Sequence, residues 1–171
     1  MKVLPVRKQN RLQNYDYSQC GAYFVTICAK NHFELFGTID VGANCVRPQL
    51  SQTGEIVEAE TKNISSIYQF VCVDCFVIMP NHVHMIIVIE QPNDKNRQMV
   101  KDGRTQFAPT ISRVIKQWKG AITKKVGFPV WQKSFHDHII RNETDYIRIA
   151  KYIENNPATW KDDCHYLPIT N

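Results

Sequence analysis

The most constraining feature of this 171-residue sequence is a pair of apolar segments separated by a two-residue turn. Phe70–Met79 and His82–Glu90 are rich in β-branched and aromatic residues, which favour strands, whereas Pro80-Asn81 has the residue types of a tight turn. We therefore predict two antiparallel strands that form a hairpin. The second strand is apolar over most of its length, which is typical of a strand at the centre of a sheet.

The remaining elements follow in an order that predicts the fold class. We expect a first strand over Tyr23–Cys28, a helix from a cap at Ser51 or Thr53 to about Ile67, a helix over Thr110–Val126, a fourth strand over Val130–Ile140, and a last helix from Asn142 to Asn155-Asn156-Pro157. Two split β-α-β units in this order make a ferredoxin-like β-α-β-β-α-β sandwich of the α+β class, with an additional C-terminal helix. In that arrangement the first and third strands are central. We expect residues 31–50 to form a small hairpin insertion.

Length and composition indicate one globular domain over residues 1–171, because a chain that is 43% hydrophobic can bury a single core. Within it we expect a basic N-terminal arm over residues 1–20, a flexible loop over 91–109 and a C-terminal tail over 158–171. The sequence has no run of 18 apolar residues, and its start lacks the apolar stretch of a signal peptide. We therefore expect a soluble, cytoplasmic protein whose six scattered cysteines are free thiols.

The net charge of +5 is modest but unevenly placed. Basic residues outnumber acidic residues before position 20, and residues 110–126 carry five bases and no acid. Many basic faces are merely solvated, but this asymmetry favours a polyanionic partner such as nucleic acid.

His82 and His84 project from the same face of the third strand, because side chains two residues apart on a strand point the same way. Two imidazoles in this arrangement can bind one divalent cation. The alternative is that both are structural histidines satisfied by hydrogen bonds. A central apolar strand favours the metal site, because titratable side chains are unfavourable to bury without a partner. His136 and His138 repeat the spacing on the fourth strand, where we favour a structural role.

The last helix places two further polar side chains at the border of its buried face. Its apolar stripe is centred on Ile149 and Ile153, and Tyr146 belongs to that stripe. Tyr152 lies to one side, and Asn156, four residues later, stands over it on the same flank. A hydroxyl nucleophile and an amide ligand could therefore both face a metal, although Tyr152 by itself is better explained as a boundary tyrosine.

Together these motifs resemble the HUH single-tyrosine (insertion-sequence) transposases. His82-Val83-His84 on a strand is followed some 70 residues later by a helix with tyrosine and asparagine four residues apart, just before a proline. The surrounding segments are similar to the REP-associated tyrosine transposase branch of that family: Arg11, Tyr15-Asp16-Tyr17, Gly21, Tyr23–Cys28, M-P-N-H-V-H, Trp131-Gln132, F-H-D-H-I-I-R-N-E and Y-I-E-N-N-P. The resemblance spans about residues 7 to 157.

The resemblance implies an enzyme that cleaves and rejoins single-stranded DNA folded into hairpins, such as palindromic repeats. It implies that His82 and His84 bind Mg²⁺ or Mn²⁺ with Asn156 as a third ligand, and that Tyr152 attacks the scissile phosphate to form a 5′-phosphotyrosine. Strand transfer then needs no external energy source, because this linkage retains the phosphoester energy. The residues that we expect to contact DNA are Arg7, Lys8, Arg11, Gly21, Tyr23, Arg113, Lys116 and Lys124.

Two other functions stay open at this point. The chain could be a catalytically silent nucleic-acid-binding module of the same fold, or a metal-dependent nuclease that uses water and for which Tyr152 is dispensable. The sequence also leaves open the target DNA and whether the protein is a monomer or a homodimer.

Overall fold

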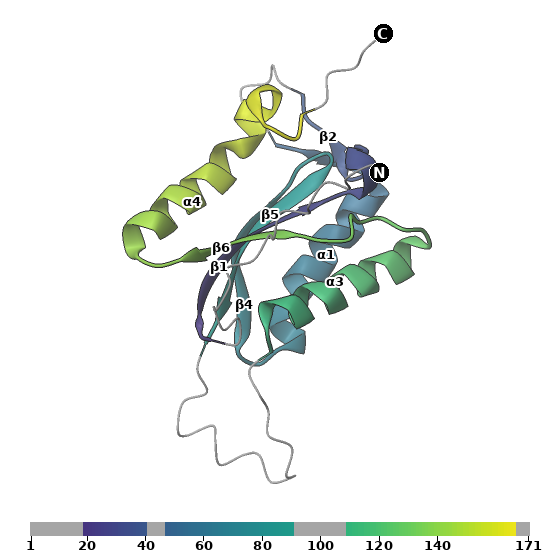
Figure 1. The fold of residues 1–171 in the computed structure, drawn as a ribbon. Helices are drawn as coiled ribbons and strands as arrows, with labels where there is room; N and C mark the ends of the chain where they lie inside the picture. The colour runs from purple at the N-terminus through teal and green to yellow at the C-terminus, as the bar shows by residue number, and fades with distance from the viewer. Residues whose placement is uncertain (1–18, 41–46, 91–108, 167–171) are drawn as a thin grey trace, which may run out of the picture.

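A four-stranded antiparallel sheet forms the centre of the computed structural model, which describes residues 19–40, 47–90 and 109–166. The strands lie in the order β4-β5-β1-β6 (Figure 1). Their bounds are β1 (Gly21–Cys28), β4 (Val71–Ile78), β5 (His82–Ile89) and β6 (His136–Ile140). The first and third strands of the predicted unit, β1 and β5, are central, which confirms the ferredoxin-like arrangement.

A short irregular segment links β1 to the first long helix. It contains the 3₁₀ helix η1 (Lys30–His32) and two short strands, β2 (Gly37–Thr38) and β3 (Gln49–Leu50). β2 and β3 pair in antiparallel fashion, as the small hairpin predicted for residues 31–50.

The fourth strand of the sheet is shorter than predicted. We expected it to begin at Val130, but it begins at His136. The ammonium group of Lys119 donates hydrogen bonds to the carbonyl oxygens of Gln132 and Ser134, at 2.9 and 2.8 Å. Before His136 the described chain pairs with the end of β1 at an isolated bridge between Trp131 and Ala29 and not as a continuous strand.

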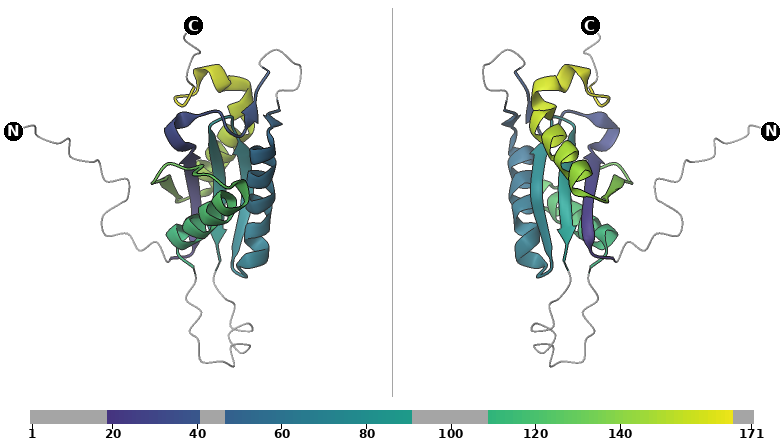
Figure 2. Two further views of the ribbon diagram at one scale, coloured as in Figure 1. Left: turned by 90° about the vertical axis from the view of Figure 1, so that its right-hand side faces the viewer. Right: turned by 90° about the vertical axis from the view of Figure 1, so that its left-hand side faces the viewer.

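Two helices cover one face of the sheet (Figure 2). α1 (Gln52–Ile67) begins after Ser51, whose hydroxyl accepts a hydrogen bond from the Gly54 amide, and α3 (Ile111–Val126) begins after Thr110. Each cap satisfies an amide that has no partner within its helix. The main core lies between these helices and the alternate strand residues that face them, among them Tyr23, Val25, Ile27, Val83, Met85 and Ile87.

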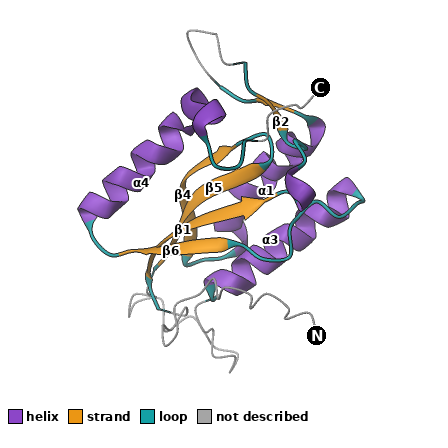
Figure 3. Ribbon diagram, turned by 45° about the horizontal axis from the view of Figure 1, so that its top comes forward, coloured by secondary structure: helices purple, strands orange, loops and turns teal. Residues whose placement is uncertain are grey.

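A third helix, α4 (Glu143–Asn155), covers the opposite face (Figure 3). Ile149 and Ile153 pack against Ile86 of β5, which confirms the predicted buried stripe. The α-helix ends where the sequence predicts, but the chain continues into the 3₁₀ helix η2 (Asn156–Asp162), so part of the predicted tail is structured.

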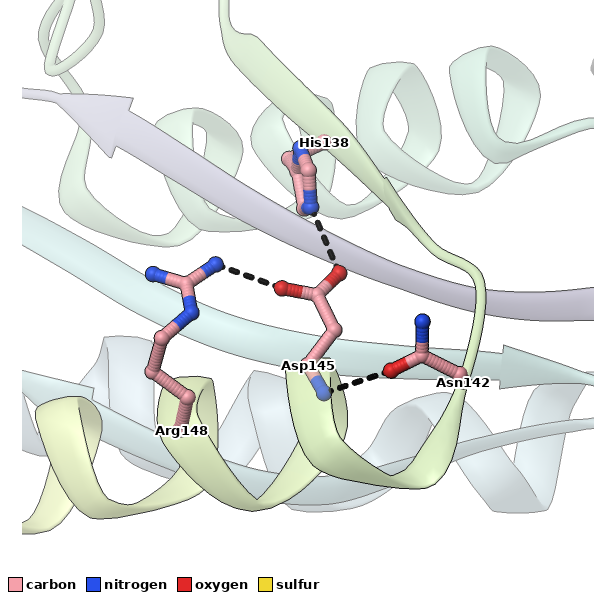
Figure 4. A network of polar contacts seen from close by, with 4 residues as sticks. All are labelled: His138, Asn142, Asp145 and Arg148. Carbon is pink, nitrogen blue, oxygen red and sulfur yellow. Dashed lines mark hydrogen bonds and ion pairs between the residues drawn. The ribbon is translucent and has the colours of Figure 1, made fainter.

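A polar network fixes the first turn of α4 (Figure 4). The carboxylate of Asp145 accepts hydrogen bonds from His138 at 2.8 Å and from Arg148 at 2.5 Å. The Asp145 amide donates to the side-chain oxygen of Asn142, the residue that caps the helix, at 2.8 Å. The hydrogen bonds to the carboxylate lower the pKa of Asp145. Because His138 belongs to β6, the network ties the start of α4 to the edge of the sheet.

No helix in the described ranges is long and apolar enough to cross a membrane. Arg7, Lys8 and Arg11 of the predicted N-terminal arm lie outside the described residues, as does nearly all of the loop predicted over 91–109.

Gly54 and Gly120 provide a matched test of the packing around α1. A Cβ atom on Gly54 would lie 2.0 Å from the carbonyl oxygen of Phe36, whereas one on Gly120 in α3 would meet nothing within 4 Å. We expect Gly54→Ala to lower the free energy of unfolding by about 2 kcal/mol or more, because backbone must move apart. Gly120→Ala should raise it by up to about 1 kcal/mol, since alanine favours the helix. Urea denaturation measures both; two changes of the same sign would contradict this packing.

Candidate active site

His82 and His84 lie at the start of β5, on the face that α4 covers. Both are buried, with 0% and 2% of their surface exposed. The Nε2 atoms of the two imidazoles are 3.0 Å apart. Ile86 continues this face, whereas Val83 and Met85 belong to the core beneath α1 and α3. The two imidazoles thus converge, as the strand periodicity predicts.

The other nitrogen of each imidazole is held by a neighbouring side chain. Nδ1 of His82 lies 2.9 Å from the side-chain oxygen of Asn81. The amide group of Asn81 donates to two backbone carbonyl oxygens, at 3.3 and 2.8 Å, so its oxygen is left to accept from His82. Nδ1 of His84 lies 2.8 Å from the hydroxyl oxygen of Thr26. With Nδ1 protonated, His82 presents the lone pair of Nε2 to the site.

Burial keeps both histidines neutral. It lowers the pKa of His84 to about 3, although the charge of Asp163 opposes this shift. The pKa of His82 is also strongly lowered, first by burial and then by the neighbouring His84 and His165. Both imidazoles are therefore uncharged at neutral pH, the form that binds metal ions.

Tyr152 on α4 points its hydroxyl group at the histidine pair. The hydroxyl oxygen lies 3.3 Å from Nε2 of His84 and 3.4 Å from a carboxylate oxygen of Asp163. The ring of Phe24 meets the Tyr152 ring edge to face, and 42% of Tyr152 is exposed. Burial and then the charge of Asp163 raise the pKa of Tyr152 to about 12. Its hydroxyl is therefore protonated at neutral pH, and the side chain is partly open to solvent.

Asn156 is buried beside Tyr152, with 1% of its surface exposed. Its amide nitrogen donates to a carboxylate oxygen of Asp163 at 2.9 Å. Its side-chain oxygen Oδ1 is buried and has no hydrogen-bond partner among the described residues. An unpaired buried acceptor is unfavourable, so this atom is suited to binding a cation.

Asp163 is the main site residue that the sequence patterns did not reveal. It follows η2 in the segment predicted to be a tail, and it contacts both Tyr152 and Asn156. No periodic pattern marks this position. The one available signal is the run Asp162-Asp163-Cys164-His165, which places four residues of metal-ligating types shortly after the site helix.

The described residues offer four donor groups to a divalent cation. Ligand atoms of His82, His84 and Asp163 lie within 4.8 Å of one another, and Oδ1 of Asn156 is unpaired nearby. Adjacent ligands at roughly 2.1 Å from an octahedral ion are about 3.0 Å apart, close to the separation of the two Nε2 atoms. The spacing of the two imidazoles therefore fits a divalent cation, and the donor types of the set, two neutral imidazoles, a carboxylate and an amide oxygen, suit one.

The predicted DNA-binding residues on α3 lie away from this site. Arg113, Lys116 and Lys124 belong to the helix that covers the sheet face opposite α4 (Figure 2). Lys124 borders a shallow pocket of about 420 Å³ together with Trp131. A contact of this helix with DNA stays a prediction, and it would involve a second surface.

The two predicted DNA-binding residues of β1 differ in their surroundings. Tyr23 is fully buried, and its hydroxyl donates to the carbonyl oxygen of Gln19 at 2.7 Å. Contrary to the prediction, its side chain therefore belongs to the core and presents no surface to DNA. Gly21 begins the strand, and a Cβ atom there would meet nothing within 4 Å, so its role stays a prediction.

Comparison with known proteins agrees with the fold and with the motifs. No protein-family model matches the chain. A solved structure of a REP-associated tyrosine transposase bound to a REP hairpin superposes with a TM-score of 0.62 at 19% identity, and the match covers 88% of this chain and 74% of that one. At this identity the likeness concerns the fold.

Two proteins of Haemophilus influenzae are related in sequence. One, named "Uncharacterized protein", is 37% identical over 172 residues, which are 94% of this chain and 93% of that protein. The other, named "Putative REP-associated tyrosine transposase", is 26% identical over 149 residues, which are 86% of this chain and 77% of that protein. The chain is thus similar in sequence and in fold to REP-associated tyrosine transposases. The resemblance that its motifs predict is thereby confirmed.

The buried histidines make the stability of the protein depend on pH. The pKa of His84 is about 3 in the folded chain, whereas the ordinary pKa of an exposed histidine is 6.5. Because the unfolded chain binds more protons below pH 6.5, the free energy of unfolding should fall as the pH drops below that value. The expected loss is up to about 1.4 kcal/mol per pH unit for each such histidine.

Urea denaturation of metal-free protein between about pH 7 and pH 5 measures this dependence. We expect His84→Gln to flatten it, and His138→Gln, at a half-exposed position, to leave this contribution intact. Equal slopes for wild type and His84→Gln would contradict a buried neutral His84.

Proposed function

We propose that the chain cleaves and rejoins single-stranded, hairpin-containing DNA through a covalent 5′-phosphotyrosine on Tyr152, with a divalent metal ion. The observation that carries the proposal is the position of the Tyr152 hydroxyl, 3.3 Å from His84 and 3.4 Å from Asp163. A nucleophile, a proton acceptor and a cluster of metal-ligating atoms thus meet in one place.

Hairpin DNA is the substrate class that the related structure supports, because that transposase is bound to a REP hairpin and its fold covers 88% of this chain. All the residues of the proposed site come from one chain, including the tyrosine and both histidines. This supports a monomer as the active unit.

His82, His84, Asp163 and Oδ1 of Asn156 would hold Mg²⁺ or Mn²⁺. When bound, the ion would polarise the scissile phosphate and offset the negative charge that develops on it. The hydrogen bonds of Asn81 and Thr26 would orient the imidazoles for this task.

The carboxylate of Asp163 lies within reach of the Tyr152 hydroxyl and can receive its proton. The hydroxyl has a pKa of about 12, so it must lose its proton to become an effective nucleophile. Asn156 donates a hydrogen bond to the Asp163 carboxylate and so holds it beside the hydroxyl. As the bond between the tyrosine oxygen and phosphorus forms, the bond from phosphorus to the 3′ oxygen breaks, and that oxygen takes up a proton as a free 3′-hydroxyl. A second 3′-hydroxyl can reverse the attack and join a new strand.

Tyr152 and Tyr146 make a matched pair for testing the nucleophile. Both lie on α4, but the hydroxyl of Tyr146 donates to Asp74 at the edge strand β4. We expect wild type and Tyr146→Phe to form a covalent adduct with a labelled hairpin oligonucleotide and Mg²⁺ or Mn²⁺, visible on a denaturing gel. Tyr152→Phe should form none, because it lacks the attacking oxygen.

The same assay separates the alternatives. Cleavage without an adduct, unchanged in Tyr152→Phe, would indicate a nuclease that uses water. Binding without cleavage at any metal concentration would indicate a silent DNA-binding module. Full cleavage by His82→Ala combined with His84→Ala would exclude the proposed role of the histidines.

Asp163 and Asp162 provide a matched pair for testing the proton acceptor. Asp163 contacts Tyr152, whereas its neighbour Asp162 is exposed. We expect Asp163→Asn to slow adduct formation by about 10²- to 10⁴-fold, because it removes the proton acceptor. Asp162→Asn should react at the wild-type rate. A rise of the Asp163→Asn rate with pH toward the wild-type value would agree with a lost base, whereas equal rates for both variants would contradict this role.

A further inference from the structure

A second cluster of metal-ligating side chains lies next to the active site and has no part in the chemistry proposed above. It comprises Cys28 at the end of β1, His32 in η1 and His165 after η2. One ligand atom of each lies within 4.8 Å of the others, and the Cys28 sulfur is 3.9 Å from Nδ1 of His165. Three segments that are far apart in the sequence therefore bring together thiol and imidazole donors, which suit Zn²⁺.

His32 is held in this cluster with an unused nitrogen. Its Nδ1 is buried and has no hydrogen-bond partner among the described residues. The backbone has φ of 56° at both Asn31 and His32, in the left-handed region that residues other than glycine rarely adopt. Strain of this kind persists where the surrounding structure imposes it, and it gathers at binding sites. A bound cation would satisfy the unused nitrogen.

Cys164 adds a fourth donor beside His165. Ligand atoms of Asp163, Cys164 and His165 lie within 4.8 Å of one another, and Cys164 is exposed.

We propose that Cys28, His32 and His165 bind Zn²⁺, with Cys164 or a water molecule in the fourth position. Two thiolates and two imidazoles are a common ligand set of structural zinc sites. As the bond between sulfur and zinc forms, the S–H bond of Cys28 breaks and its proton passes to solvent. The cluster differs in chemistry from the neighbouring active-site set, whose third ligand is a carboxylate.

A zinc ion bound to Cys28 and His165 would hold the segment after η2 against the end of β1. The ring of His165 lies 5.5 Å from that of His32 and 4.6 Å from that of His82, measured between centroids. The carbonyl oxygen of His165 accepts a hydrogen bond from Asn81 at 2.8 Å. Asp163 is two residues from His165, so a ligand bond to His165 would also hold the active-site carboxylate in place.

Cobalt substitution tests the proposal without DNA. Co²⁺ bound by a thiolate gives a sulfur-to-metal charge-transfer band in the near ultraviolet, which a site with only nitrogen and oxygen ligands cannot give. We expect wild type to develop this band with equimolar Co²⁺ and to lose it when Zn²⁺ is added. Cys28→Ser should lose the band, whereas Cys75→Ser, on β4, should keep it.

The active-site histidines supply a second control. His82→Ala combined with His84→Ala should keep the band, which separates this site from the cation proposed for DNA cleavage. His32 is partly exposed, so His32→Ala is the variant less prone to unfold, and it should weaken Co²⁺ binding by about tenfold or more.

Three outcomes would overturn the proposal: no band in wild type, a band that persists in folded Cys28→Ser, or unchanged affinity in His32→Ala. Circular dichroism of each variant establishes that it is folded. Because none of these readouts involves DNA cleavage, failure of the zinc site is distinguishable from failure of the proposed transposase activity.

Discussion

The pairing of β5 with β1 is the constraint on which the candidate site depends. Its register sets Cys28 opposite His82 and Thr26 opposite His84, all on the face beneath α4. A slip of one residue would turn both imidazoles toward α1 and α3 and bring Val83 into the site. The apolar residues that alternate with the histidines fill the main core, so the energy that fixes the register comes from packing on the far face of the sheet.

Asp163 contributes a negative charge to the site, between the histidine pair on β5 and Tyr152 on α4. Its carboxylate accepts hydrogen bonds from Asn156 and Tyr152, beside two imidazoles that burial keeps neutral. A partly buried carboxylate among uncharged neighbours is unfavourable, and the same charge raises the pKa of Tyr152. A DNA phosphate would add a further negative charge at this point. The arrangement of the protein's own groups therefore favours a positive charge within the cluster.

The order of the elements along the chain was sufficient to predict the order of strands in the sheet. Patterns confined to one element were sufficient to predict the convergence of His82 and His84 and the place of Tyr152 beside the buried stripe of its helix. Asp163 was not predictable, because it reaches the site only through the path of η2, which no periodicity encodes. Tyr23 was misassigned, because an aromatic residue on a strand has the same pattern whether it faces the core or the solvent. The five basic residues between positions 110 and 126 lie on a helix, α3, as expected, but the sequence does not specify which face of the sheet that helix covers.

The polar network at the start of α4 determines what can move during the proposed reaction. Asp145 fastens the first turn of α4 to β6 through His138, and Tyr152 follows seven residues later, roughly 10 Å along the helix axis. Beyond Tyr152 the chain is fastened again, because Asn156 and Trp160 are buried. A DNA end joined to Tyr152 would thus be carried by a helix secured on both sides of the attachment point. Tyr152 and the DNA joined to it would therefore stay in place, and strand exchange would proceed by movement of the second DNA strand toward Tyr152.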